Sequence, residues 1–164
     1  MRSTYVEISQ RISGECQELE RVINRALRAW PQAQKSTDEQ NVYLDSVALN
    51  LHSFYSGLEK LFELIAKHID HSIPEGETWH RDLLNQMACE VDDIRPAVIS
   101  QNNAKSLDEF RRFRHLVRNI YTTNLVPGRI EKLMSRLSEL WDSLCAELLA
   151  FAEFVDELSK EIND

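Results

Sequence analysis

The chain has 164 residues and a formal net charge of -8, with 43% hydrophobic and 28% charged residues. This length and composition indicate one globular domain and exclude a disordered segment. Gly and Pro occur only 4 times each, which argues against a turn-rich β protein and favours long helices. Because we find neither a run of about 18 apolar residues nor an apolar N-terminal signal core, we expect a cytoplasmic protein that does not contact membranes.

The cysteines, Cys16, Cys89 and Cys145, are odd in number and far apart, and they form no CxxC pair. This spacing argues against a disulfide framework and against a zinc site, and it favours a reducing compartment. We expect neither a metal nor a cofactor.

The first two predicted elements are long amphipathic helices. Apolar residues at steps of three and four predict a helix over 3–30 that Pro31 ends. Thr37-Asp-Glu-Gln40 has the pattern of a capping box and predicts the start of a second helix, which runs to about Ile69. Gly57 lies inside this helix, where either a close helix–helix approach or simple tolerance would explain it.

The middle of the chain predicts shorter elements. A loop over 72–76 precedes a helix over 77–90, and in the ambiguous segment 92–101 a proline either starts a helical turn or breaks one. We expect a loop over 101–105. Ser106-Leu-Asp-Glu109 has the pattern of a second capping box and predicts the start of a basic helix that continues to about residue 123. Val126-Pro-Gly128 then gives a stop signal.

The last predicted helix, from Ile130 to Ile162, has apolar residues at alternating steps of four and three. This heptad pattern suits an intermolecular coiled coil or a bundle within one chain, and the other amphipathic helices favour the bundle. We therefore predict an all-α fold, an antiparallel helical bundle of four to six helices in a single domain over 1–164. Three helices would be long, with a shorter pair over 77–123.

The basic helix is the chemically unusual feature of the sequence. Segment 105–123 has five basic and two acidic residues in an otherwise acidic chain. At about 100° per residue, an apolar arc (Phe110, Phe113, Leu116, Val117, Ile120) lies beside a cationic stripe (Arg111, Arg114, His115, Arg118), with Tyr121 on the border between them. The arginines either pair with carboxylates of neighbouring helices or form a phosphate site. A histidine in such a site transfers protons near neutral pH.

The segment Phe113-Arg-His-Leu-Val-Arg118-Asn119-Ile-Tyr121 resembles the HEPN superfamily, and above all the HepT-like toxins found beside small MNT nucleotidyltransferases. The resemblance implies a helical bundle that dimerises and brings two basic motifs together in a cleft. It also implies a metal-independent ribonuclease in which an Arg stabilises phosphate charge and a His moves a proton. In these toxins the MNT partner can nucleotidylate a Tyr just after the motif.

Of the family's motif, this chain matches Arg118 and Asn119. From the resemblance and the cationic stripe together, we predict a catalytic site of Arg118, His115, Arg114 and Tyr121. We predict RNA phosphate binding by Arg111, Arg114, Arg118 and Asn119. The expected partners are RNA, a second copy of the chain and an MNT nucleotidyltransferase antitoxin. The family's motif places its His after the Arg, whereas here Thr122, Thr123 and Asn124 follow. The alternative is therefore a degenerate HEPN domain that binds nucleotide, RNA or a protein without cleavage, or a purely structural bundle.

Three other histidine groups invite a functional interpretation. His68-Ile-Asp-His71 has metal-like residue types, although its predicted place at a helix end favours a role toward the helix dipole. The group Trp79-His-Arg-Asp82 either joins the basic cleft or makes an interhelical contact, and we favour the contact. His52 lies beside an apolar stripe and is expected to pack.

Overall fold

A computed structural model describes residues 1–119 and 127–162 of the chain. These residues form α1 (Arg2–Ala33), α2 (Gln40–His68), α3 (Trp79–Met87), α4 (Gln101–Asn119) and α5 (Pro127–Glu161). Within the described ranges there is no strand, only an isolated bridge between Val91 and Arg95. The predicted all-α fold is confirmed. None of the described helices combines the length and apolar character needed to cross a membrane.

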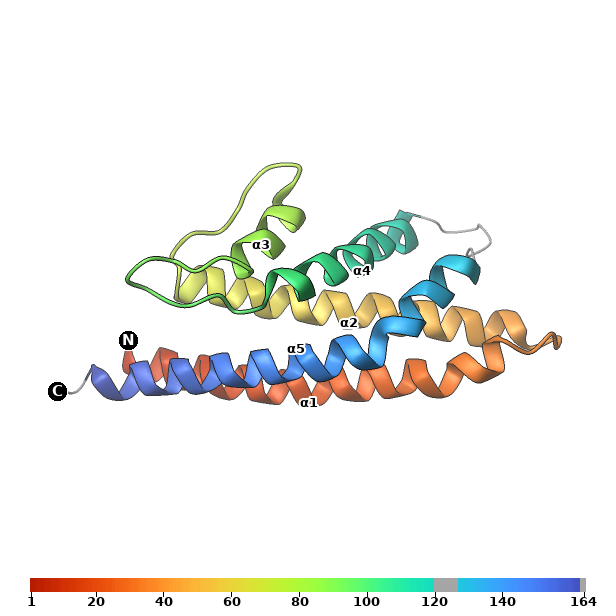
Figure 1. The fold of residues 1–164 in the computed structure, drawn as a ribbon, viewed down its shortest axis with the longest axis horizontal. Coiled ribbons are helices and arrows are strands. Elements are labelled where there is room, and N and C mark those ends of the chain that lie inside the picture. Colours follow the sequence, from red (N-terminus) through yellow and green to blue (C-terminus); the bar gives the residue numbers. More distant parts are fainter. Residues whose placement is uncertain (120–126, 163–164) are drawn as a thin grey trace.

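The helices form a bundle with a smaller layer on one side. α1 packs along both α2 and α5 and runs in the direction opposite to both (Figure 1). α3 and α4 pack on α2, on the side away from α1 (Figure 1). The expected arrangement of three long helices with a shorter pair is therefore confirmed.

One hydrophobic cluster takes side chains from every described helix. The heptad positions of α5 turn into this cluster, from Ile130 through Leu144 to Val155, so the bundle within the chain accounts for most of the seam. Phe54 of α2 contacts Phe110 of α4 and Trp141 of α5 in edge-to-face geometry. These aromatic contacts join the α4 layer to the main bundle.

Two features of α1 bear on the sequence predictions. A Cβ placed on Gly57 of α2 would lie 3.0 Å from the Cδ2 atom of Leu19, so the close helix approach explains this glycine. Cys16 of α1 also lies near Cys145 of α5, a proximity that the sequence spacing did not predict. Burial, and then the neighbouring thiol, raise the pKa of Cys16 to about 12.

The predicted start of the basic helix was wrong by five residues. α4 begins at Gln101, so 101–105 is helical and Ser106 lies inside the helix rather than at its cap. The hydroxyl of Ser100 accepts a hydrogen bond from the backbone N–H of Asn103, 3.1 Å away, and so caps the first turn. A carboxylate oxygen of Glu147 also accepts a hydrogen bond from the Asn103 side chain. The local cap and the tertiary contact with Glu147 both stabilise the earlier start.

Three further helix ends differ from their predictions. The side chain of Gln40 donates a hydrogen bond to the carbonyl of Ala33 at the end of α1 and does not close a capping box with Thr37. α1 continues through Pro31 to Ala33, because the N–H of Gln34 still reaches the carbonyl of Trp30. Pro31 costs one hydrogen bond in the last turn, where the helix tolerates the loss. The last helix was predicted to begin at Ile130, whereas α5 begins three residues earlier, at Pro127.

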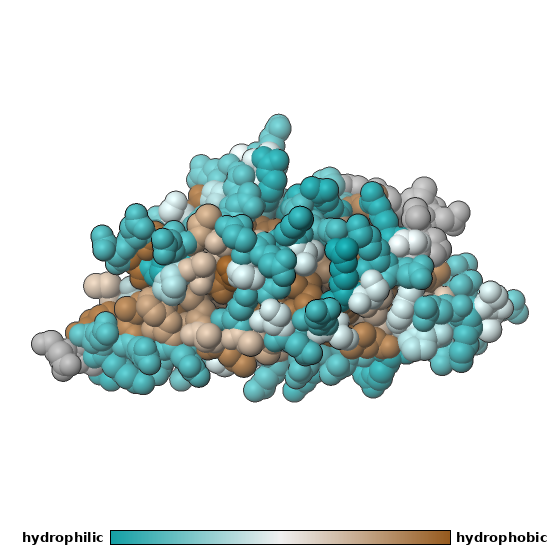
Figure 2. Space-filling model, viewed as in Figure 1, coloured by the Kyte–Doolittle hydropathy of each residue, from teal (hydrophilic) through white to brown (hydrophobic). Residues whose placement is uncertain are grey.

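The surface differs between the two layers. Hydrophilic side chains cover most of the upper part of the face in Figure 2, over α3 and α4. Hydrophobic side chains gather lower on the same face, toward the C-terminal part of α5 (Figure 2). The polar layer formed by α3 and α4 contains the basic helix, and the candidate site lies there.

Candidate functional site

A cleft of about 530 Å³ opens between the start of α3 and the middle of α4. Two of its lining side chains are guanidinium groups and two are imidazoles, against the single carboxylate of Glu77. The complete lining is Gly76, Glu77, Thr78, Trp79, His80, Arg81, Arg111 and His115. A concave site with this excess of positive charge suits an anionic ligand.

α4 contributes Arg111 and His115 to the cleft, one helical turn apart. Phe110 and Phe113 of the same helix are buried, which turns the two polar side chains away from the core. The Nε atom of Arg111 donates a hydrogen bond to Asp108 at 2.8 Å, and this orients the guanidinium. His115 is exposed at the cleft.

Beside the cleft, the carboxylate of Glu59 from the middle of α2 is only 3% exposed. Its Oε1 atom accepts a hydrogen bond from the guanidinium of Arg114. Its Oε2 atom lies 2.7 Å from Nδ1 of His80. An isolated buried carboxylate would be costly, and the two partners on α4 and α3 compensate it. The cluster Glu59–His80–Arg114 therefore ties three helices together at the edge of the cleft.

Two contacts at the start of α3 fix the direction of its first side chains. The ring of Trp79 stacks on the ring of His80, with centroids 3.6 Å apart and planes 29° apart. The hydroxyl of Thr78 donates a hydrogen bond to Asp82 at 2.8 Å. Stacking and the contact with Glu59 together restrict the imidazole to one orientation.

Tyr55 lies one helical turn before Glu59 and is fully buried. Its hydroxyl has no hydrogen-bond partner within 1–119 and 127–162. Burial, followed by the negative charge of Glu59, raises the pKa of this phenol well above its ordinary value. Tyr55 therefore stays neutral and adds no charge to the cluster above it.

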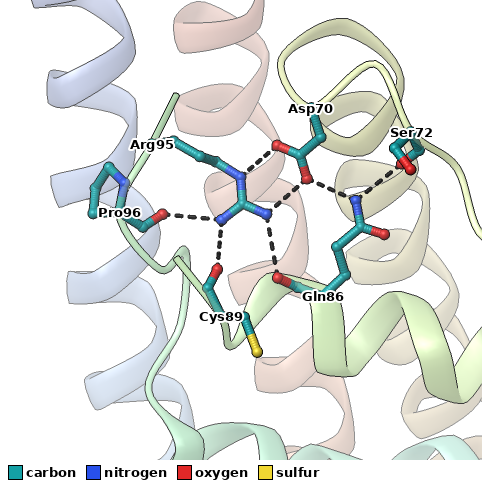
Figure 3. Close-up of polar contacts among 6 residues, drawn as sticks. All are labelled: Asp70, Ser72, Gln86, Cys89, Arg95 and Pro96. Carbon is teal, nitrogen blue, oxygen red and sulfur yellow. Dashed lines mark hydrogen bonds and ion pairs between the residues drawn. The ribbon is translucent and has the colours of Figure 1, made fainter. Parts of the chain in front are cut away.

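A second buried ion pair holds α3 in place from its other end. The guanidinium of Arg95 contacts the carboxylate of Asp70, with NH2 and Oδ2 2.7 Å apart, and both side chains are almost wholly buried. Arg95 also donates to the backbone carbonyls of Gln86, Cys89 and Pro96 (Figure 3). The network joins the end of α2, the end of α3 and the segment before α4, and so positions the side chains at the start of α3.

The structure brings together part of the predicted site. Arg111 and His115 line the cleft, whereas Arg114 turns under it toward Glu59 with 14% of its side chain exposed. Arg118 and Asn119 belong to the last turn of α4, and their side chains lie outside the part that the structure describes, as does all of Tyr121. The roles predicted for these residues stay predictions.

The group Trp79-His-Arg-Asp82 both makes an interhelical contact and joins the cleft. His80 makes the expected interhelical contact with Glu59 and also lines the cleft with Trp79 and Arg81. The carboxylate of Asp70, between His68 and His71, forms an ion pair with Arg95. Among the described residues, no three His, Cys, Asp or Glu side chains are grouped so as to hold a metal ion.

The sequence analysis did not predict a role for Glu59, although its place in the helical pattern of α2 is unusual for an acidic residue. It lies between Tyr55 and Phe62 at helical spacing, so an acidic residue occupies a position on the buried face of α2. An ionisable residue in that place requires a partner from another element. The sequence alone does not identify His80 and Arg114 as the partners, because they lie on other helices.

Comparison with known families gives a match over residues 46–155, to a family model described as "HepT-like protein". The matched range includes Glu59, the start of α3 and all of α4. Searches of curated proteins and of solved structures found no match.

Proposed function

We propose that the chain, which belongs to the HepT-like family of the HEPN superfamily, is a metal-independent ribonuclease that acts on RNA in the cleft between α3 and α4. One observation carries the proposal: two imidazoles and two guanidinium groups line one cleft. Cleavage of RNA by its own 2′-hydroxyl needs a base, an acid and a stabilising positive charge at the phosphate. Imidazoles and guanidiniums supply all three without a metal.

Within this proposal, Arg111 binds the phosphate and His115 transfers a proton. The contact between Arg111 and Asp108 holds the guanidinium in place without burying it fully. Arg114 acts through Glu59, because its guanidinium is already bound to that carboxylate and the carboxylate contacts His80 of the cleft. The assignments of Arg118, Asn119 and Tyr121 rest on the sequence resemblance.

The biological setting in this proposal also follows from the family. The chain would act in the cytoplasm as a homodimer and as the toxin of a toxin–antitoxin pair. Its antitoxin would be an MNT nucleotidyltransferase that modifies Tyr121. Purification of the chain with the product of a neighbouring small nucleotidyltransferase gene would test the pairing.

A second candidate function is RNA binding without cleavage. The observation in its favour is that Arg114 is engaged by Glu59 beneath the cleft and is not among the lining residues. The absence of a His just after Arg118 in the sequence also supports it. This candidate predicts RNA binding that weakens steeply with salt and yields no product.

The two candidates are separated by incubating single-stranded RNA with the purified chain in excess chelator. A ribonuclease yields cleavage products with the wild type and at least 10-fold less with Arg111→Ala or His115→Ala. Arg112→Ala is the matched control, since Arg112 also pairs with Asp108 but does not line the cleft. Products from all four proteins at equal rates would refute the assignment to this cleft. Salt-sensitive binding without product would favour the second candidate.

A further inference from the structure

His80 is held in a way that suits proton transfer. A distance of 2.7 Å between Nδ1 and a carboxylate oxygen of Glu59 requires a proton between the two atoms. Because Glu59 is held as a carboxylate by Arg114, the proton belongs to Nδ1. The neutral imidazole then has its lone pair on Nε2, as a carboxylate-oriented histidine has in a catalytic dyad or triad.

The other ring nitrogen of His80, Nε2, is placed to contact a ligand in the cleft. The side chain of His80 is 29% exposed, and the residue lines the same cleft as His115. Nδ1 is turned toward Glu59, and Nε2 is the ring nitrogen farther from the backbone. Trp79 stacks on the ring and restricts its rotation, so the orientation is fixed before any ligand binds.

We propose that His80 is the general base of the cleft, that Glu59 and Arg114 position it, and that His115 is the general acid; this rests on the proposed ribonuclease function. Nε2 of His80 takes the proton of the ribose 2′-hydroxyl while the 2′-oxygen forms a bond to phosphorus. The bond from phosphorus to the 5′-oxygen breaks, and protonated His115 gives a proton to that oxygen. The products are a 2′,3′-cyclic phosphate and a 5′-hydroxyl, and exchange with water restores both histidines.

The charged groups around His80 come from three elements. Glu59 of α2 and Arg114 of α4 face Nδ1, with the nearest guanidinium nitrogen 3.5 Å away. Across the cleft are Arg111 and His115 of α4, and near the start of α3 are Glu77, Arg81 and Asp82. The carboxylate of Glu59 lies closest to the ring, so it stabilises the imidazolium that forms when the base takes its proton.

The test compares His80→Ala with the matched control His68→Ala, which removes a histidine outside the cleft. We expect kcat of His80→Ala to fall about 100-fold or more with KM changed less than about threefold, because removal of a general base affects the transition state. The acidic limb of the rate–pH profile should disappear, and added imidazole should restore part of kcat. Glu59→Gln should lower kcat about 10-fold without rescue by imidazole, since its base is present but misplaced.

The outcomes separate the role of His80 from the proposed ribonuclease function. Wild-type protein that yields no product in chelator overturns the proposed ribonuclease function, and the role of His80 with it. If wild type cleaves and His80→Ala cleaves with the same kcat and pH profile, the role of His80 alone is overturned. A loss of kcat with an unchanged pH profile and no imidazole rescue also overturns it, because a purely structural role would have that result.

Discussion

The molecule contains two buried arginine–carboxylate pairs whose surroundings differ. Arg95 and Asp70 are enclosed, with side chains 0% and 2% exposed, and all N–H groups of the guanidinium have acceptors. Arg114 and Glu59 lie at the edge of the cleft. The Nε atom of Arg114 is buried and has no hydrogen-bond partner in the described structure, and His80 shares the carboxylate.

The two pairs differ in whether a ligand can reach them. A charge network in which every donor is satisfied has no capacity left for a ligand, and it connects elements (Figure 3). The Arg114–Glu59 pair also contacts His80, whose side chain reaches the surface. A change of charge on this histidine can therefore be coupled to a bound molecule. The Arg95–Asp70 pair holds α3 in position. In this position, His80 of α3 reaches the carboxylate of Glu59 at the edge of the cleft.

Arg95→Ala is expected to have the largest effect on stability. The substitution leaves the carboxylate of Asp70 buried with only Gln86 as a side-chain partner, and it removes donors from three backbone carbonyls. We expect a loss of about 3–5 kcal/mol in the free energy of unfolding, measured by urea denaturation. Arg95→Lys should recover little of it, because an ammonium cannot replace the planar fork.

Arg21→Ala is the control for this measurement. Arg21 makes an exposed pair with Glu18 on α1, and we expect its removal to change the free energy of unfolding by less than about 0.5 kcal/mol. Equal effects of Arg95→Ala and Arg21→Ala would show that the enclosed network does not support the fold.

Arg114→Ala tests the other member of the comparison. His80 remains beside Glu59 in this variant, and the site reaches solvent, so we expect a smaller loss of about 1–3 kcal/mol. The same urea titrations measure it. A loss as large as that of Arg95→Ala would mean that the two pairs are equally structural and that the distinction between them is wrong.

The smallest effect on stability is expected from removing the hydroxyl of Tyr55, one helical turn before Glu59. Tyr55→Phe removes a buried group without a described hydrogen-bond partner, so stability at neutral pH should be unchanged or higher by up to about 1 kcal/mol. Because burial and Glu59 raise the pKa of Tyr55, the unfolded chain loses this proton first, and stability falls as the pH rises above the ordinary value of 10.0. Tyr55→Phe should remove this part of the alkaline loss.

Thermal unfolding between pH 8 and 11 checks this prediction, with Tyr43→Phe as the control on a half-buried tyrosine of the same helix. A Tyr55→Phe variant that unfolds much more readily than wild type at pH 8 would show that the hydroxyl has a stabilising partner.

Much of the fold was predictable because helical periodicity is a local property. The seam from Ile130 to Val155 identified α5 and its buried face, and the apolar positions of α4 predicted which way Arg111 and His115 point. Helix ends were harder to predict. The start of α4 depends in part on Glu147 of α5, whose carboxylate accepts hydrogen bonds from the backbone N–H of Ser100 and the side chain of Asn103, 47 and 44 residues earlier in the chain.

The sequence alone predicted the class of fold, the family resemblance and the basic face of α4, because each follows from the spacing of residues within helices. The packing of the helices decides which side chains of that face line the cleft. Arg114 and Arg111 are neighbours on the predicted stripe, yet one binds Glu59 beneath the cleft and the other lines it. The physical reason is that a buried carboxylate needs partners wherever it lies. Where α2, α3 and α4 pack together, Arg114 and His80 are the side chains that reach Glu59. This contact directs Arg114 to Glu59 and leaves Arg111 and His115 to line the cleft from α4.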